Sequence, residues 1–298
     1  MNPLKKINPV LEFDEIDRAQ GVERTYLYYN NLSYHFNTEK QDVNIIESPY
    51  WGKMLFLDGT LQSTTRDEIM YHNALVHPLM DVLQTKKHIL ILGGGEGATA
   101  REVLRWDVNK VTMVDYDKEL VSFMIHKENS WAQGAFYDQR LKVVYDDAWA
   151  YMESIVKNGT RYDGVIVDLT DPNLKKEKWL PLFEMIIKTI NGEGGFVMNA
   201  GLYVPWDTTQ LKEIKELIEG LCITHPGLKY YIYTLYIPSF NGEWTFIVVA
   251  NKRRFMLDPS LLQVIPSWIR RGIKQLENKH IELPAYTIPC INTIFSKI

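Results

Sequence analysis

The sequence predicts an α/β protein, in which a doubly wound sheet follows a small N-terminal antiparallel β-domain. From about residue 66, short and nearly all-apolar strands alternate with stretches in which apolar residues recur at helical spacing. This pattern is typical of a parallel sheet covered on both faces. Before that point, between Thr25 and Ser63, apolar and polar residues alternate in runs separated by turn residues. We therefore expect two domains, residues 1–65 and residues 66–298.

The composition indicates an ordinary globular protein. The chain has 298 residues, 46% of them hydrophobic and 23% charged, and a formal net charge of −4. This balance gives no reason to expect nucleic acid as a partner. Met1 to Phe13 has no apolar core of a signal peptide, and no run of 18 apolar residues occurs, so we expect a cytoplasmic protein with no membrane segment. Two distant cysteines are expected to be free thiols.

The N-terminal region is expected to form strands joined by tight turns. Asp42–Ile46 and Lys53–Leu57 are the clearest strands, and Asp58-Gly59 is a strong hairpin signal after which Leu61 resumes the pattern. These features predict a small antiparallel sheet.

The larger region is expected to begin with a helix from Asp67 and to end in a tail from Leu257, with a helix through Trp268 and Ile273. The elements predicted between them are strand His88–Leu92, helix Ala98–Leu104, strand Val111–Val114, a helix from Lys118, and strands Leu141–Val144, Gly164–Val167 and Phe196–Met198.

A glycine cluster, Gly93 to Gly97, joins an apolar strand to a helix, where backbone can approach a nucleotide closely. With Ala98 the loop also fits a dinucleotide fingerprint, so a nicotinamide or flavin site is an alternative. Glu96 favours a cationic ligand instead, because a carboxylate would repel a pyrophosphate. Its alternative role is a solvent-facing acid at a helix start.

Acidic residues follow the next two strands. Asp115 is placed to accept from ribose hydroxyls, and Asp147 to accept from an adenine amino group. The alternative for such acids is helix capping, for which Asp117 is better placed than Asp115 and for which Asp146 or Asp147 is suited. The ordered set of glycine loop, Asp115 and Asp147 is characteristic of adenosyl sites in Rossmann-like, methyltransferase-type folds.

The strand Tyr162 to Val167 delivers Asp168 to the ligand edge, and Asp171 follows in a turn ended by Pro172. Two carboxylates at this spacing can flank an ammonium group, one steering it and one removing a proton. An amine of pKa about 10 must lose its proton before it can attack carbon. A solvated Asp-rich turn is the alternative.

Several motifs resemble the spermidine and spermine synthases, and among them most closely the thermospermine synthase class. The matching segments are Lys40-Gln41-Asp42, Gly52 through Gly59, Gln62 through Glu68, Tyr71-His72, Gly93 through Glu102, Asp168 through Pro172 and Ile237 through Phe240. The Gly95-Glu96-Gly97 form of the loop and the segment Ile237 to Trp244 look like the thermospermine class.

The resemblance implies an aminopropyltransferase that uses decarboxylated S-adenosylmethionine as co-substrate, with no separate cofactor. It implies a Rossmann-like catalytic domain and assembly as a homodimer or homotetramer. The residues that it assigns to the donor are Gln41, His72, Gly93, Gly95, Glu96, Asp115, Asp147 and Ala148. It makes Asp168 the general base and assigns the acceptor amine to Tyr71, Asp168, Asp171, Gln62 and Trp244.

The expected acceptor is spermidine, giving thermospermine or spermine and methylthioadenosine. A spermidine synthase acting on putrescine is the alternative within the family, because the Lys-rich segment after Pro172 departs from the usual Gly-Pro gate. An S-adenosylmethionine-dependent methyltransferase and a catalytically silent binding protein are the alternatives outside it. No metal is expected, because His77, His126 and His225 lack partners at ligand spacing.

Overall fold

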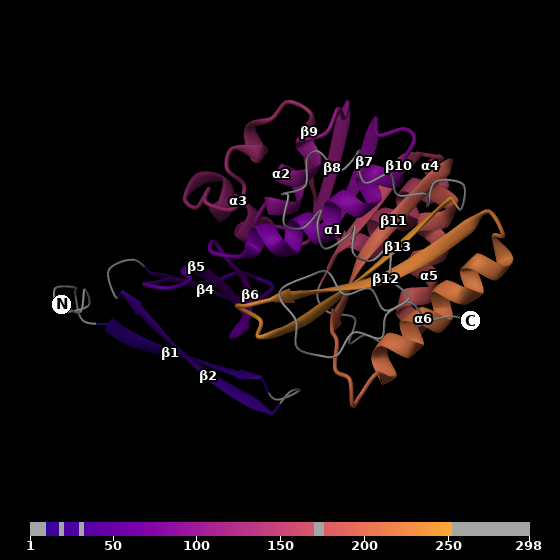
Figure 1. The fold of residues 1–298 in the computed structure, drawn as a ribbon. Coiled ribbons are helices and arrows are strands. Elements are labelled where there is room, and N and C mark those ends of the chain that lie inside the picture. The colour runs from indigo at the N-terminus through magenta and orange to yellow at the C-terminus, as the bar shows by residue number, and fades with distance from the viewer. Residues whose placement is uncertain (1–9, 18–20, 30–32, 170–175, 252–298) are drawn as a thin grey trace.

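The computed structural model describes residues 10–17, 21–29, 33–169 and 176–251, which form three β-sheets and flanking helices (Figure 1). Asp171 and the tail from Leu257, with its predicted helix through Trp268 and Ile273, lie outside these residues. Among the described helices, none combines the length and the apolar character that crossing a membrane requires.

The N-terminal region contains a two-stranded hairpin and a four-stranded antiparallel sheet, as the alternation predicted. Its strands are β1 (Val10–Asp17), β2 (Val22–Tyr29), β3 (Tyr34–Asn37), β4 (Asp42–Ser48), β5 (Gly52–Leu57) and β6 (Thr60–Thr64). The predicted start near Thr25 is wrong, because β1 precedes it. Four of the eight residues of β1 are acidic, and acidic residues are rare in strands, so its sequence gives little strand signal.

The turn between β5 and β6 is the hairpin that Asp58-Gly59 predicted. Both residues have positive φ, 49° at Asp58 and 77° at Gly59, as a type I′ turn requires. The turn also ties β5 back to β4, because the Asp58 carboxylate accepts a hydrogen bond from the backbone N–H of Asp42 at 2.8 Å.

A seven-stranded sheet of order β12-β13-β11-β10-β7-β8-β9 forms the centre of the larger region. Its strands are β7 (His88–Gly93), β8 (Lys110–Asp115), β9 (Leu141–Tyr145), β10 (Tyr162–Asp168), β11 (Ile190–Leu202), β12 (Leu228–Ile237) and β13 (Gly242–Asn251). Strands β7 to β11 pair in parallel, and the hairpin β12–β13 joins them antiparallel to β11. The predicted strand Phe196–Met198 is the middle of the longer β11.

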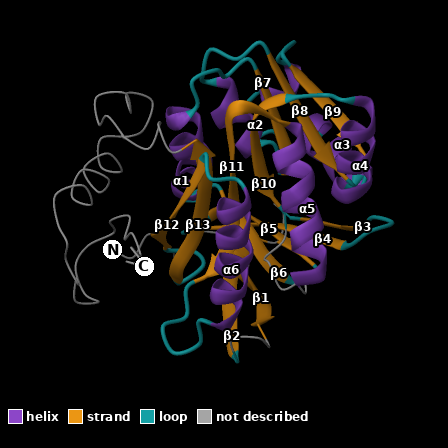
Figure 2. Cartoon of the chain, turned by 90° about the vertical axis from the view of Figure 1, so that its right-hand side faces the viewer, coloured by secondary structure: helices purple, strands orange, loops and turns teal. Residues whose placement is uncertain are grey.

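Alternation along β7 explains how the sheet is covered on both faces. Ile89 and Ile91 pack into one hydrophobic core with α1 (Glu68–Val82) and α2 (Ala98–Leu104). Leu90 and Leu92 pack into another with α4 (Ala148–Asn158), α5 (Lys176–Thr189) and α6 (Thr209–Thr224). In Figure 2, α5 and α6 lie side by side on one face. A further helix, α3 (Lys118–His126), follows β8.

The strand order reverses direction between β7 and β10. From β7 the chain adds β8 and then β9 on one side, and it returns to add β10 and β11 on the other. In open α/β sheets a crevice forms beyond the carboxyl ends of the strands at such a point. Asp168, the last residue of β10, pairs there with Gly93, the last residue of β7.

Candidate active site

A cavity of about 600 Å³ opens at this switch point. Every predicted site residue that the structure describes contributes to its wall. They are Gln41, Gln62, Tyr71, His72, Gly93, Gly95, Glu96, Asp115, Asp147, Ala148, Asp168 and Trp244. The fold therefore brings together residues from both the N-terminal sheet and the larger sheet.

At two positions of the loop, neighbouring atoms lie so close to the backbone that only glycine fits. A Cβ at Gly93, where φ is +86°, would lie 2.1 Å from the carbonyl oxygen of Asp168. A Cβ at Gly95 would lie 2.9 Å from Oδ2 of Asp115. The absence of side chains at these two positions lets both carboxylate-bearing strand ends reach the cavity.

Asp168 is held at the cavity wall by two hydroxyl groups. The Tyr71 hydroxyl donates to Oδ1 at 3.0 Å, and the hydroxyl of buried Thr99 donates to Oδ2. Burial and the neighbouring Glu96 carboxylate raise the pKa of Asp168 to about 6, against the lowering effects of His72, Thr99 and Tyr71. A carboxylate with this pKa is ionised at neutral pH and is a better proton acceptor than an exposed aspartate.

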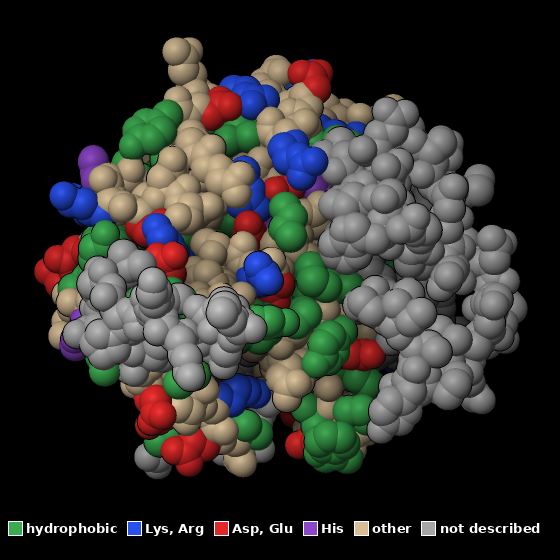
Figure 3. Space-filling view, turned by 60° about the vertical axis from the view of Figure 1, so that its left-hand side comes forward, with side chains coloured by type: hydrophobic (Ala, Val, Ile, Leu, Met, Phe, Trp, Pro, Cys, Tyr) green, Lys and Arg blue, Asp and Glu red, His purple; other side chains and the backbone are tan. Residues whose placement is uncertain are grey.

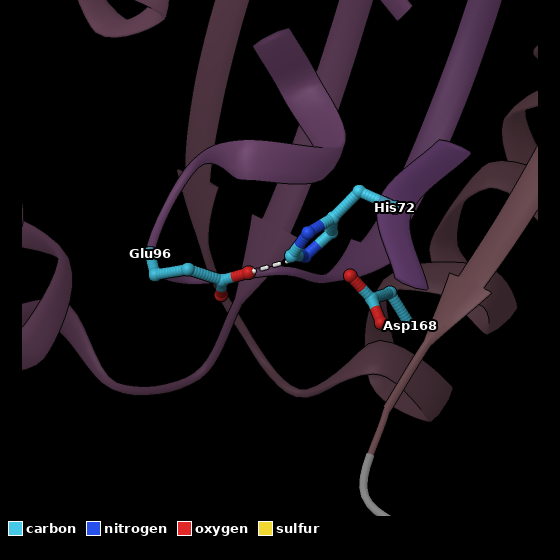
Figure 4. A group of neighbouring side chains, drawn as sticks. All are labelled: His72, Glu96 and Asp168. Atoms are coloured by element: carbon cyan, nitrogen blue, oxygen red, sulfur yellow. Dashed lines mark hydrogen bonds and ion pairs between the residues drawn. The ribbon is translucent and has the colours of Figure 1, made fainter. Parts of the chain in front are cut away.

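His72 lies between two carboxylates. Its Nδ1 is 2.8 Å from Oε2 of Glu68, and its Nε2 is 2.9 Å from Oε1 of Glu96. Burial alone would lower the pKa of His72, but the hydrogen bonds and charges of Glu68 and Glu96 raise it to about 10. The ring is therefore a cation at neutral pH, and it fixes the Glu96 carboxylate at the cavity wall (Figure 4).

Glu68 is in turn anchored by Arg101, whose two terminal nitrogens donate to its two oxygens at 2.9 and 2.8 Å. Burial opposes ionisation of Glu68, but His72 and Arg101 together lower its pKa. The orientation of Glu96 thus depends on a chain of charges that begins at Arg101 on α2 and passes through Glu68 and His72 on α1.

Within the described residues, His72, Glu96 and Asp168 are the group whose ligand atoms lie close enough to consider a metal, all within 4.8 Å of one another (Figure 4). A protonated imidazole has no lone pair to give to a metal, and both His72 nitrogens already face carboxylates. The geometry favours an acid–base cluster over a metal centre, and the absence of a metal stays a prediction.

The part of the cavity wall beyond the ends of β8 and β9, which we call the β8–β9 side, carries Asp115, Asp147 and Gln41. Burial is the main cause that raises the pKa of Asp115 to about 6, although its Oδ1 accepts from the backbone N–H of Asp117 at 2.9 Å. Gln41 donates its amide to Asp117 at 2.8 Å, which holds it beside this strand end.

Helix capping also occurs on this side, as the sequence allowed. Asp117 accepts from the backbone N–H of Leu120 and caps α3. Asp147 caps α4 through the backbone N–H groups of Trp149 and Ala150, and both bonds end on Oδ1. The cap therefore accounts for one of the two oxygens of Asp147, while the residue still lines the cavity.

The opposite part of the wall, which we call the β11–β13 side, carries the aromatic rings of Trp244, Phe240 and Tyr71. Trp244 is 9% exposed, and its indole N–H donates to Asn199 at 2.8 Å. Phe240 packs against Trp244 with ring centroids 4.6 Å apart, and Tyr71 contacts Phe240 edge-on. Gln62 from β6 completes this side, with its amide donating to the carbonyl of Thr60.

Sequence reasoning missed several residues of the site. Thr99 lies two residues after the glycine loop and does not line the cavity, and nothing in the sequence indicates that its hydroxyl meets Asp168. Asn199 lies toward the carboxyl end of β11, directly after the apolar run Phe196–Met198, where a polar residue could have been noted. Glu15 and Arg24 come from the hairpin whose first strand was missed. Their positions depend on long-range packing.

The cavity is acidic, whereas the described part of the surface face shown in Figure 3 mixes acidic and basic side chains. The carboxylates among the described lining residues are Glu15, Asp58, Glu96, Asp115, Asp146, Asp147 and Asp168. Only Arg24 supplies a Lys or Arg side chain to this described wall, and His72 adds an imidazolium. The net negative charge suits a cationic ligand and disfavours an anionic one.

Two family models match the chain. The spermine/spermidine synthase domain matches residues 68–259, and the spermidine synthase tetramerisation domain matches residues 13–65. A polyamine aminopropyltransferase of Aeropyrum pernix is 35% identical over 260 residues, covering 85% of this chain and 76% of the relative. One of Pyrobaculum calidifontis is 37% identical over 215 residues, covering 70% and 72%.

Solved structures of spermidine synthases share the fold. The Thermotoga maritima spermidine synthase has a TM-score of 0.71 at 22% identity, covering 96% of this chain and 92% of that one. A spermidine synthase in complex with the transition-state analogue AdoDATO has a TM-score of 0.72 with the same identity and coverage. These likenesses confirm the Rossmann-like fold with an N-terminal β-domain.

Proposed function

The chain belongs to the spermine/spermidine synthase family, a family of transferases, and from this premise we propose that it transfers the aminopropyl group of decarboxylated S-adenosylmethionine to a polyamine. The observation that carries the proposal is the position of Asp168. Held by Tyr71 and Thr99, it lies where the β8–β9 side and the β11–β13 side of one acidic cavity meet.

The chemistry requires a proton acceptor and little else. The acceptor nitrogen attacks the methylene carbon next to the sulfonium, the C–S bond breaks, and its electron pair stays on sulfur in neutral methylthioadenosine. Before this attack, the acceptor ammonium gives up one proton to Asp168, which then passes it to water. Since the thioether is already a good leaving group, the protein contributes mainly positioning and deprotonation.

The β8–β9 side is proposed to hold the adenosine part of the donor. Asp115 would accept from the ribose hydroxyls, and the free oxygen of Asp147 from the adenine amino group. Glu96, fixed by His72, would pair with the amine of the aminopropyl arm. Glu96 and Asp168 together would repel the carboxylate of intact S-adenosylmethionine, which argues against methyl transfer.

The β11–β13 side is proposed to hold the acceptor, with Tyr71, Gln62 and Trp244 along its aliphatic chain. Spermidine is the proposed acceptor, giving thermospermine or spermine, because the Gly95-Glu96-Gly97 loop and the segment Ile237 to Trp244 resemble the thermospermine class. Putrescine is the competing acceptor, and the spermidine synthases among the structural neighbours support it.

Assembly into a homodimer or homotetramer is also proposed. It is supported by the match of residues 13–65 to a model described as a tetramerisation domain. Ile16 and Leu27, on the two strands of the β1–β2 hairpin, are 60% and 50% exposed in the single chain. Size-exclusion chromatography with light scattering measures the oligomer, and a monomer at micromolar concentration would contradict this part of the proposal.

Product analysis tests the proposed reaction. The purified protein is incubated with decarboxylated S-adenosylmethionine and putrescine, spermidine or spermine in turn, and products are identified by mass spectrometry and chromatography against thermospermine and spermine standards. We expect methylthioadenosine and a tetraamine from spermidine. Calorimetry with intact S-adenosylmethionine is the control, and equal affinity for both donors, or methylated product, would overturn the proposal.

A further inference from the structure

An ion pair from the β1–β2 hairpin reaches the wall of the cavity. Glu15 on β1 and Arg24 on β2 are direct cross-strand partners, and Nη1 of Arg24 lies 3.2 Å from Oε2 of Glu15. Both residues line the cavity, next to Leu61 and Gln62 of β6. The Glu15 side chain is only 3% exposed, and that of Arg24 is 17% exposed.

Glu15 is fixed by more than Arg24. Its Oε1 accepts from the backbone N–H of Leu61 at 2.8 Å, and its Oε2 also accepts from the Tyr26 hydroxyl at 2.8 Å. Donors from β2 and β6 thus hold the carboxylate in one position. Burial disfavours an unpaired charge, and this carboxylate is compensated jointly by the Arg24 guanidinium, the Tyr26 hydroxyl and the Leu61 N–H.

The pair is unusual within this cavity. The other carboxylates of the described wall contribute negative charge, and His72 is already shared between Glu68 and Glu96. At the hairpin end, Arg24 cancels the charge of Glu15. An ammonium group of a bound ligand that reached this end would meet the guanidinium and would have to compete with it for the same carboxylate.

We propose that the Glu15–Arg24 pair determines which polyamines the cavity takes, by setting the net charge of its hairpin end. This inference rests on the proposed function, because it assigns the hairpin end to the acceptor. With both residues present the pair is neutral, so an ammonium far from the reacting amine gains no ion pair there. The pair therefore limits the advantage of long polyamines over short ones.

Two single variants change this charge in opposite directions while keeping side-chain size similar, and a double variant is their control. Arg24→Gln leaves the pair at −1, Glu15→Gln leaves it at +1, and the double variant returns it to neutral. Binding of putrescine, spermidine and spermine is measured by calorimetry with saturating methylthioadenosine, a readout that does not need turnover. Thermal melting of each variant checks folding.

The expected result is a change in the ratio of spermine affinity to putrescine affinity. Arg24→Gln should tighten spermine about tenfold relative to putrescine, and Glu15→Gln should weaken it about tenfold, as one charge in a partly screened cavity predicts. The double variant should restore the ratio of the original protein to within about threefold. A purely structural pair would lower all affinities together and would not be rescued by the double variant.

Steady-state turnover with putrescine and spermidine separates the two hypotheses. If the protein transfers no aminopropyl group but its variants show the charge-dependent spermine-to-putrescine affinity ratios, the proposed reaction is wrong and the role of the pair in binding still holds. If Arg24→Gln does not fold, the spermine-to-putrescine affinity ratio of Glu15→Gln alone tests the inference. An unchanged ratio of spermine to putrescine affinity in the folded variants would overturn the inference.

Discussion

The β8–β9 side and the β11–β13 side of the cavity are built in different ways. On the first, Asp115 and the capping residue Asp147 stand at or just after the ends of consecutive parallel strands. On the second, the wall combines Gln62 from β6, Asn199 from β11, Trp244 from β13 and the Glu15–Arg24 pair from the hairpin. The acids of the first side follow from one repeated βα unit, to which the N-terminal region adds Gln41. The second side needs several distant segments.

This difference predicts how each side responds to change. A group at a strand end is positioned by the sheet itself, so a substitution there should affect one ligand contact and little else. Groups on the β11–β13 side position one another, as Asn199 and Trp244 do, so a substitution there should alter selectivity more gradually. Asp168, where the two sides meet, should affect the reaction without affecting donor binding.

The largest effect is expected from Asp168→Asn, which keeps the shape of the side chain but cannot accept the ammonium proton. The kcat should fall by about 10²–10⁴-fold, and raising the pH should partly restore it by supplying deprotonated acceptor. Donor affinity, measured by calorimetry, should change little. The matched control is Asp107→Asn at a highly exposed position. Near-normal turnover of Asp168→Asn with every polyamine would refute its role as the base.

A smaller effect, confined to the β8–β9 side, is expected from Asp115→Ala. Loss of a charged acceptor should weaken donor binding by about 1–3 kcal/mol, while the KM for the acceptor at saturating donor stays unchanged. Calorimetric titration of the donor measures the first quantity and steady-state kinetics the second. Glu153→Ala on the exposed face of α4 is the control. Unchanged donor affinity would remove Asp115 from the site.

On the β11–β13 side, Trp244→Phe keeps the aromatic surface but removes the indole N–H that donates to Asn199. One lost hydrogen bond of about 0.5–1.5 kcal/mol should raise the KM for the polyamine about 2–12-fold and leave donor affinity unchanged. Trp106→Phe is the matched control, since its indole donates to His77 outside the cavity. A KM effect of equal size in both variants would show that only stability had changed.

The smallest effect is expected from Thr99→Val, which removes a hydroxyl that lowers the pKa of Asp168. Since the base must be ionised, kcat/KM for the acceptor should fall as pH drops through about 6. In Thr99→Val the pKa of Asp168 rises, so this acid limb should move to higher pH. Thr245→Val, which removes a buried hydroxyl elsewhere, should leave the limb in place. A fall in rate without a shifted limb would contradict the role given to Thr99.

Short-range signals carried most of the correct predictions. The glycine loop, the apolar strands and the Asp58-Gly59 turn each depend on a few consecutive residues, whose backbone requirements are visible in the sequence. The acids Asp115, Asp147 and Asp168 were found because parallel strands place their carboxyl ends at one edge. For these acids, a place at the end of a predicted parallel strand was enough to predict a place at the cavity wall.

The α/β class, the N-terminal antiparallel sheet, the family and the acids at the strand ends could be predicted from the sequence, because all of these depend on local pattern and spacing. Three other features could be seen only in the folded chain. Thr99 donates to Asp168, the imidazolium of His72 lies between Glu68 and Glu96, and Glu15 and Arg24 reach the cavity. Each of these contacts joins residues on different elements or depends on burial. Burial and long-range charge pairing, which set the pKa values of the site, arise only when the chain packs.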